Sequence, residues 1–390
     1  MIFKKKLILF LMLFSCFFIL VSSVSAADYY VNNDTQDVST WMKSDAKNGD
    51  SLIFNVTQYE LKDTLVVNKA VTIKSDINTK LIFNKNGKDM FNLTTNNIKF
   101  SGLDIQFNAK GSSKYKPTAI AFVEKKAVVF DMDNVNITVS QSYAGAIGGE
   151  KAKGNIVNCN IILLKDNAVG FSVGTWTGNI INSTITAKGS NSYGMAFKTL
   201  KGNLINVNVQ SSGKNSIAVY AYTWNGKIEN SSIINTGKTL YDTGFVSVKS
   251  KGQIVGSTIK SSKSYSTMVS DNVKFVGSSL SSGKKFKKTY WYRAELVISN
   301  QYAVKKNTYT FIVANNGYFK SKKCHVGVSV KGKLVGKKAV KALNPGKYAI
   351  VKVKIPAKHA SAKVAKVAKV DYYNKVKEFF KKDNVFKFKG

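Results

Sequence analysis

One six-residue pattern recurs every 24 residues in the middle of this chain: Ile156-Val-Asn-Cys-Asn-Ile161, Ile180-Ile-Asn-Ser-Thr-Ile185, Leu204-Ile-Asn-Val-Asn-Val209 and Ile228-Glu-Asn-Ser-Ser-Ile233. It reads apolar, any residue, Asn or Gly, any two residues, apolar. Looser copies begin at Phe100, Met132, Ile254 and Phe275. A pattern sustained over this many copies indicates that most of the chain is built from a structural repeat.

The composition of the repeat decides between repeat architectures of similar period. Its segments are short, rich in β-branched residues and separated by Gly, Asn and Ser, which is typical of strands and turns. Leucine-rich repeats would need more leucine at fixed positions, and helical repeats would need longer helix-forming stretches. The sequence therefore predicts an all-β fold over 27–283, a parallel β-helix with one coil per 24 residues.

The Asn or Gly in each copy has a conformational explanation. The two apolar residues, such as Ile156 and Ile161, are five positions apart, a spacing that a straight strand would place on opposite faces. A bend between them lets both point inward, and Asn and Gly tolerate the left-handed backbone that a tight bend needs. We expect a stacked ladder of inward-facing side chains, with a functional role for the asparagines as the alternative. The ladder positions are Gly102, Asn134, Asn158, Asn182, Asn206, Asn230, Gly256 and Gly277.

Two further features concern the N-terminal part of the β-helix. Stacked coils expose strand edges at both ends, so they need caps. Residues 38–47 predict a short amphipathic helix, followed by a strand over 51–56, which suits an N-terminal cap. The step of 32 residues between Gly102 and Asn134 predicts an inserted loop near 109–118.

The last hundred residues differ from the repeat. After Gly283 the 24-residue spacing stops, and strand-like runs follow at 295–298, 309–314, 325–330, 350–355 and 364–370. About seven short strands separated by Gly, Asn and Pro turns predict an Ig-like antiparallel β-sandwich over 284–390. This segment holds 28 basic and 4 acidic residues, against 28 and 18 in 27–283, so the positive charge is concentrated in the smaller unit.

The N-terminus predicts export. Lys4, Lys5 and Lys6 precede an apolar run over 7–21 and the small-residue site Val24-Ser-Ala26. This is the pattern of a signal peptide over 1–26, and an uncleaved anchor helix is the alternative. The apolar run is shorter than the roughly 20 residues that span a bilayer, which favours cleavage and an exported protein without a transmembrane span.

Several stretches also resemble known families. Residues 47–54 and 65–73 resemble the opening segment of right-handed parallel β-helix proteins, and the Asn-bearing coils resemble their pectate-lyase-like repeats. The C-terminus is similar to the adhesion-related, Ig-like module known as CARDB at 311–317, 332–336, 343–346 and 370–378. The usual asparagine-rich end of that module is only partly present, as Asp383-Asn384. The whole chain resembles the adhesin-like surface proteins of methanogenic archaea, which implies adhesion at a cell surface.

The residue inventory argues against an enzyme. Two histidines and three cysteines are too few for zinc sites or a disulfide scaffold. Parallel β-helix lyases generally use a basic residue, most often arginine, and a carboxylate cluster for calcium, but Arg293 is the one arginine and lies outside the coils. Hydrolases need two suitably spaced carboxylates, usually near a histidine, and His325 and His359 lie in the other unit. We therefore predict no catalytic residues and no cofactor.

Asp131 and Asp133 are the best acidic pair in the coils, because a spacing of two places them on one face of a strand. We interpret them as solvated surface residues. A Ca²⁺ site at this pair is the weaker alternative. A lysine could serve as a catalytic base, but 58 lysines give no means of choosing one.

Aromatic residues provide a candidate binding surface. Trp176 and Trp224 occur in matching Thr-Trp-x-Gly contexts two coils apart, and Tyr193 and Tyr222 fall near the same part of the repeat. A stripe of such side chains along a rod could stack against sugar rings, and the alternative is that many of them fill the interior. Glycosylation sequons occur at Asn33, Asn55 and Asn92. Sequons at the ladder positions Asn182 and Asn230 would be inaccessible if their amides face inward.

These observations predict an exported cell-surface or secreted protein that binds a glycan or an anionic envelope polymer without catalysis. The lysine-rich unit could attract a polyanion. The alternative explanation of the lysine excess is the base composition of the genome. Near absence of arginine argues against a dedicated nucleic-acid binder. The alternatives are a polysaccharide lyase or glycoside hydrolase with a non-standard site, and a structural spacer of the envelope.

Overall fold

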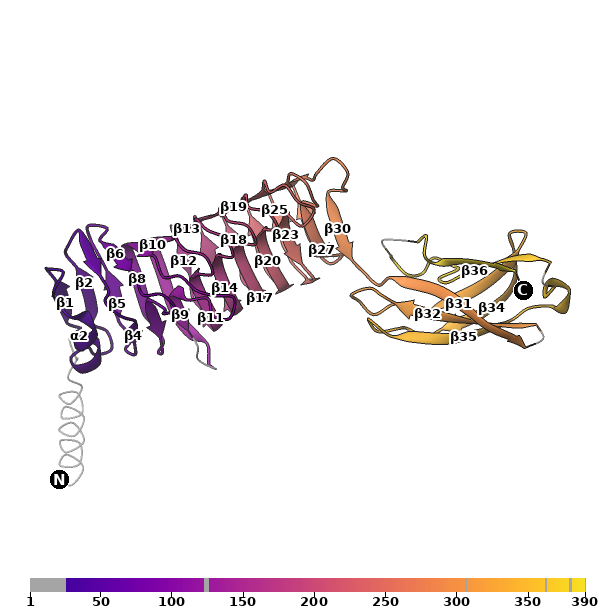
Figure 1. Ribbon diagram of the computed structural model, residues 1–390, viewed down its shortest axis with the longest axis horizontal. Helices are drawn as coiled ribbons and strands as arrows, with labels where there is room; N and C mark the ends of the chain where they lie inside the picture. The colour runs from indigo at the N-terminus through magenta and orange to yellow at the C-terminus, as the bar shows by residue number, and fades with distance from the viewer. Residues whose placement is uncertain (1–25, 123–125, 306, 362, 379–380, 390) are drawn as a thin grey trace, which may run out of the picture.

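The computed structural model describes residues 26–122, 126–305, 307–361, 363–378 and 381–389. The predicted signal peptide over 1–26 lies outside these residues, apart from Ala26. Figure 1 shows a long stack of parallel strands, coloured indigo to orange, followed by a smaller sandwich coloured orange to yellow. No helix of the described chain is both long enough and apolar enough to cross a membrane.

The stack is a parallel β-solenoid of about 11 turns within the described residues. Three columns of strands run along it, and most coils contribute one strand to each column. The first column contains β1 (Asp28–Val31), β2 (Ser51–Phe54), β5 (Thr72–Lys74), β8 (Ile98–Phe107), β10 (Val128–Val139), β12 (Ile156–Val157), β15 (Ile180–Ile181), β18 (Leu204–Ile205), β21 (Lys227–Glu229), β25 (Gln253–Val255) and β28 (Lys274–Val276).

The second column shares β8 and β10, which continue around the bend. Its other strands are β3 (Gln58–Glu60), β6 (Lys80–Phe83), β13 (Asn160–Leu163), β16 (Thr184–Ala187), β19 (Asn208–Ser211), β22 (Ser232–Asn235), β26 (Thr258–Ser261) and β29 (Ser279–Ser281). The third column contains β4 (Leu65–Val67), β7 (Phe91–Leu93), β9 (Thr118–Phe122), β11 (Gly145–Lys153), β14 (Val169–Thr177), β17 (Tyr193–Lys201), β20 (Ile217–Trp224), β23 (Thr243–Ser247), β24 (Lys249–Ser250), β27 (Thr267–Ser270) and β30 (Thr289–Tyr292).

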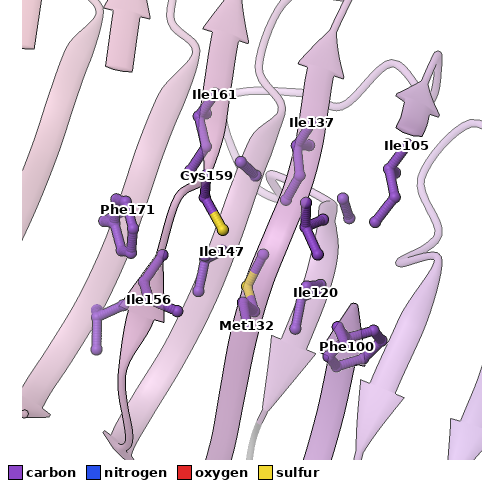
Figure 2. Packing of buried hydrophobic residues seen from close by; sticks show 14 of the residues in the cluster. Phe100, Ile105, Ile120, Met132, Ile137, Ile147, Ile156, Cys159, Ile161 and Phe171 are labelled. Carbon is purple, nitrogen blue, oxygen red and sulfur yellow. The ribbon is translucent and has the colours of Figure 1, made fainter. Parts of the chain in front are cut away.

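The register confirms the 24-residue repeat. Ile161 pairs with Ile185, which pairs with Val209, so the same position of each coil lies directly above its predecessor. Parallel strands in register place similar side chains above one another. The interior therefore consists of continuous apolar rows. Figure 2 shows Met132, Ile156 and other buried side chains filling the space between the columns. Each fully buried side chain of this size contributes roughly 1.5–3 kcal/mol.

The backbone confirms the predicted bends and corrects the direction of the side chains. The ladder asparagines adopt left-handed φ values, for example 53° at Asn158 and 49° at Asn182, as do Gly102 and Gly256. However, the ladder asparagines are exposed, so the prediction of inward-facing amides is wrong. The left-handed residue occupies the outside of the bend, and the next residue, such as Cys159, points into the core instead.

The N-terminal cap and the inserted loop are both present. Helix α2 (Val38–Ser44) is capped at its N-terminus by Asp37, whose carboxylate accepts hydrogen bonds from the backbone N–H groups of Ser39 and Thr40. Trp41 stacks on Tyr29 with ring centroids 5.0 Å apart, which seats the helix on the first coil. The insertion corresponds to the segment 108–117, which contains no strand and connects β8 to β9.

The C-terminal unit is a two-sheet sandwich, as predicted. One sheet contains β31 (Leu296–Lys305), β32 (Thr308–Asn315) and β35 (Tyr348–Lys354), in that order. The other has the order β34 (Lys333–Val340), β33 (Cys324–Val330), β36 (Ala365–Lys369) and β37 (Val385–Lys389), and a short 3₁₀ helix spans Ala357–His359. All pairings are antiparallel, and Tyr309, Phe311 and Val328 form part of a separate core between the sheets. Parallel pairing continues to Tyr292 in β30, beyond Gly283, where the spacing of the sequence repeat stops.

Candidate functional site

A groove runs along the outer face of the third column. It consists of three adjoining cavities of about 190, 510 and 620 Å³. The first two share Ser172 in their lining, and the last two share Tyr220, so the hollows are continuous. Because the strands cross the groove, its long direction is the axis of the solenoid.

The inserted loop forms the N-terminal wall of the groove. The hydroxyl of Tyr115 donates to Asp89 Oδ2 at 2.6 Å, while Asp89 Oδ1 accepts from the backbone N–H of Thr118 at 2.7 Å. Asp89 therefore fixes the loop to the preceding coil at two points. Burial and the adjacent carboxylate raise the pKa of Tyr115, so the hydroxyl remains a proton donor.

Small side chains form the floor of the N-terminal half. Ala121, Gly148, Ser172 and Ala196 pair in register on successive strands, and all line the cavities. A large outward side chain at these positions would fill the hollow. The groove therefore results from a row of small residues that follows the wall formed by the inserted loop.

The same row becomes aromatic and apolar toward the C-terminal end. Ala196 pairs with Tyr220, which pairs with Val246, and Met268 and Tyr290 follow. Tyr193 lies beside this row and meets Tyr220 edge to face, with ring centroids 6.4 Å apart. Exposed Leu240 and Tyr241 complete the lining from a loop.

Part of this aromatic surface is covered by the CARDB-like unit. Val246, Val248 and Tyr292 form a small buried cluster outside the solenoid interior, and Phe319 of the sandwich packs against it. The ring of Tyr318 lies 4.6 Å from that of Tyr292. The sandwich therefore borders the C-terminal end of the groove.

The charged residues of the groove are mostly lysines. Lys116 and Lys198 line it, and Lys249 Nζ lies 5.3 Å from the centre of the Tyr222 ring. The side chain of Lys116 reaches solvent, yet the surrounding groove atoms desolvate its ammonium group and lower its pKa. Asp89 is the one carboxylate among the described lining residues.

The structure separates the predicted aromatic residues into two groups. Tyr193 and Tyr222 line the groove, with Tyr222 38% exposed. Trp176 and Trp224 are 0% and 1% exposed, so the prediction that they contact a ligand is wrong. Their register two coils apart is as expected, but they point into the core.

The inward direction of Trp176 has a local cause. Phe171 and Val173 point inward, so strict alternation would turn Trp176 outward. Pairing passes from Val173 to Thr175 and omits Gly174, which resets the alternation at this bend. Trp176 then packs edge to face on Phe130 at 5.7 Å.

Asp131 and Asp133 lie away from the groove, and each bonds to the first asparagine of a ladder, Asp133 through the side chain and Asp131 through the backbone. Asp133 accepts from the amide of Asn158 at 3.1 Å, and this ladder continues through Asn182 and Asn206. Asp131 accepts from the backbone N–H of Asn155 at 2.7 Å. A second ladder follows through Asn155, Asn179 and Asn203, which the sequence reasoning missed although these asparagines also recur every 24 residues.

These contacts add a structural role to the acidic pair, of which Asp133 is exposed and Asp131 is half-buried. Each amide of a ladder donates to the residue before it and accepts from the residue after it, so the first residue only has to accept. A carboxylate, which accepts but does not donate, suits that position. Within the described residues, no group of three or more His, Cys, Asp or Glu side chains is arranged to hold a metal ion. Asp131 and Asp133 therefore have a structural function as ladder ends.

The sequons differ in accessibility. Asn33 and Asn55 are exposed near the N-terminal cap, whereas Asn92 is half-buried and its Oδ1 atom is buried. The ladder residues Asn182 and Asn230 are exposed, which corrects the expectation that their amides are inaccessible.

Comparison with known proteins identifies the C-terminal unit. Residues 293–388 match the family model of CARDB. One similar structure is the solution structure of residues 272–376 of a Methanosarcina acetivorans protein, whose name describes a cell surface protein. It is 22% identical with a TM-score of 0.23, and the match covers 25% of this chain and 89% of that chain. The CARDB domain of a Pyrococcus furiosus protein, crystallised with di-metal ions, is 20% identical with a TM-score of 0.21 and covers 25% of this chain and 92% of that chain.

A comparison with solved structures also finds a match that extends over the solenoid. The Dettilon tailspike protein is 9% identical with a TM-score of 0.32, and the match covers 84% of this chain and 94% of that chain. No curated protein matches the sequence. The chain thus carries a CARDB domain at 293–388, C-terminal to a parallel β-solenoid.

Proposed function

We propose that this protein is an exported surface protein whose solenoid binds a polysaccharide in the groove without cleaving it. The continuous groove on the third column is the observation that carries this proposal. It extends from Ala121 in β9 to Tyr292 in β30. At roughly 4.8 Å per strand, seven strand spacings give a length of roughly 34 Å, which suits an extended chain of several sugar rings.

The lining residues have the chemistry that sugars require. Tyrosine rings present an apolar face to the C–H groups of a sugar, and their hydroxyls provide hydrogen bonds. Tyr193, Tyr220 and Tyr222 supply such rings within one section of the groove. The N-terminal sequence over 1–26 and the CARDB domain support a location outside the cell.

The absence of catalysis is part of the proposal. Glycoside hydrolysis uses two carboxyl groups on either side of the scissile bond. Asp89 is the one carboxylate of the described lining, and both of its oxygen atoms accept hydrogen bonds that fix the loop. A polysaccharide lyase is the second candidate, because the lowered pKa of Lys116 would favour a neutral amine that can act as a base.

Retention on immobilised polysaccharides would test the binding function. Mature protein is passed over a panel of acidic and neutral polymers, and the variants Tyr222→Ala and Tyr193→Ala are compared with it. Loss of one stacking ring should weaken retention on the bound polymer about two- to tenfold, since such contacts are worth roughly 0.5–1.5 kcal/mol. Tyr348→Ala is the matched control, because Tyr348 is a 65% exposed tyrosine on the sandwich.

Product release in the same samples separates binding from catalysis. Reducing ends and unsaturated-uronide absorbance are followed with and without calcium, beside a heat-inactivated sample. Release that disappears in Lys116→Met would replace the binding proposal with the lyase. Failure to bind any polymer, with no product, would instead favour a structural spacer.

A further inference from the structure

We infer that the polymer bound in the groove is acidic, with its anionic groups held by Lys116 and Lys198. This inference rests on the proposed polysaccharide-binding function and adds the chemical class of the ligand.

The charge balance of the groove is positive. Lys116 and Lys198 line it, and neither forms an ion pair with a described carboxylate. Asp89 is already bound by the Tyr115 hydroxyl and by the Thr118 backbone and hydroxyl groups. Its negative charge is therefore partly satisfied, whereas both ammonium groups retain their capacity to donate.

The two lysines are spaced along the axis. Lys116 precedes β9 and Lys198 lies in β17, three strands further along the third column. Three strand spacings correspond to roughly 14 Å along the groove. A polymer lying in the groove would form ion pairs with both lysines only if it carries anionic groups at intervals. A repeating acidic polysaccharide has this property.

The surroundings of Lys198 leave it accessible. Glu150, Gly174, Lys198 and Tyr222 occupy equivalent positions on four successive strands, because the flanking residues pair in register. Gly174 provides no side chain on one side of Lys198, and it separates the lysine from Glu150 by two strands. On the other side, Tyr222 offers a ring on which a sugar could stack beside the charge.

The solvation of Lys116 also favours an anionic ligand. Groove atoms partly desolvate its ammonium group without supplying a carboxylate partner. A desolvated cation is costly unless it is paired, and a ligand carboxylate or sulfate would restore that pairing. The same reasoning predicts that ligand binding raises the pKa of Lys116 toward its ordinary value.

The test compares each acidic polymer with its own methyl ester, which keeps the sugar backbone and removes the charge. Pectate, alginate and hyaluronan are titrated onto the full mature chain at about 0.15 M salt, which weakens long-range attraction to the basic CARDB domain. We expect one acidic polymer to bind about tenfold or more tightly than its ester, as charge-assisted hydrogen bonds predict. Lys116→Met with Lys198→Met should remove most of that difference.

Lys260→Met is the control for charge loss. Lys260 is exposed on β26 of the second column, on a different face of the same solenoid, so its removal should leave the preference unchanged. Thermal unfolding of each variant shows that the fold is retained.

The outcomes separate the inference from the function on which it rests. Equal binding of acid and ester would overturn the acidic class and leave polysaccharide binding intact. Acid-selective binding that persists in the double variant would also overturn the inference and assign recognition to other lysines. Absence of binding to both forms of every polymer would overturn the proposed function together with the inference.

Discussion

The solenoid and the CARDB domain use polar groups in opposite ways. In the solenoid, asparagines form exposed ladders between residues 24 positions apart, such as Asn158 with Asn182. In the CARDB domain, a buried carboxylate connects distant segments, because Glu378 accepts from the backbone N–H of Leu296, 82 positions away. The repeat distributes its polar contacts over many equivalent sites, whereas the sandwich depends on a few that occur once.

The charge of the two units follows the same division. Residues 284–390 hold 4 acidic residues against 28 basic ones, while 27–283 hold 18 against 28. In the small unit, the carboxyl groups of Asp371 and Glu378 are buried and hydrogen-bonded by the backbone. A single substitution should therefore have local consequences in the solenoid and consequences for the whole unit in the CARDB domain.

The largest effect is expected from Trp224→Ala in the solenoid. Trp224 is buried against Phe245 with ring centroids 5.1 Å apart, and the absence of a side chain at Gly252 makes room for its ring. Truncation should cost about 3–5 kcal/mol. Because each coil contacts only its neighbours, hydrogen exchange should accelerate in the adjoining coils and remain unchanged over 293–388.

Tyr222→Ala provides the comparison for that experiment, since Tyr222 lies two residues away and is exposed. It should leave the exchange pattern almost unchanged. Accelerated exchange of the CARDB domain in Trp224→Ala would show that the two units unfold together, and would contradict their independent stability.

The second effect is a pH dependence of the CARDB domain. Burial, together with the nearby charges of Asp371 and Glu295, raises the pKa of Glu378 to about 7. Hydrogen bonds from Asn384 and Leu296 act in the opposite direction but are outweighed. The folded state then binds a proton more tightly than the unfolded state. Stability is therefore highest below about pH 4.5 for this group and falls as pH rises to about 7, by roughly 3 kcal/mol.

Glu378→Gln should flatten this dependence. Chemical denaturation between pH 4.5 and 8 measures it, with hydrogen exchange of residues 293–388 as the readout of unfolding. A smaller slope of the same sign should remain, because burial also raises the pKa of Asp383. An identical slope in the wild type and in Glu378→Gln would show that this carboxyl group does not control stability.

The bends of the solenoid provide a smaller test. Asn182 has a left-handed φ of 49° and bonds to the amides above and below. Asn182→Ala should cost about 1–2 kcal/mol, mainly through backbone strain. Asn182→Gly tolerates the same backbone and loses the ladder contacts alone, so thermal unfolding should rank it between the wild type and the alanine variant. Equal losses in both variants would assign the effect to the ladder.

The smallest effect concerns the junction of the two units. Tyr318→Ala removes the edge-to-face contact with Tyr292, worth roughly 0.5–1.5 kcal/mol. Each unit should keep its unfolding temperature, while small-angle scattering should show a wider distribution of distances between them. Tyr348→Ala on β35 is the control, and an unchanged scattering profile in Tyr318→Ala would show that the junction is held by other contacts.

Much of the solenoid was predictable because its determinants are local. The bend at each Asn or Gly depends on the conformational range of that residue alone, so the positive φ values at Asn158 and Gly256 could be predicted from sequence. The inserted loop could be predicted because any extra residues must leave the coil. The direction of the asparagine amides was missed, since it depends on which residue of the bend turns inward.

The groove was predictable only in part. Tyr193 and Tyr222 carried a sequence signal, namely aromatic residues in phase with the repeat. The floor residues Gly148 and Ala196 carried none, because small residues also recur within the core. The contact between Tyr115 and Asp89 joins residues 26 positions apart through an irregular loop, so no spacing rule could have predicted it.

The sequence by itself determined the repeat length, the bends, the division into two units and the distribution of charge. Each of these depends on composition or on the intrinsic preference of single residues. Only the tertiary structure decided which side chains face the groove, since an irregularity that falls at Gly174 in one coil and at Lys198 and Tyr222 in the next two resets the alternation of faces along these strands. It also decided where distant segments meet, as at Asp89 and Glu378, because such contacts form only when the whole chain is folded.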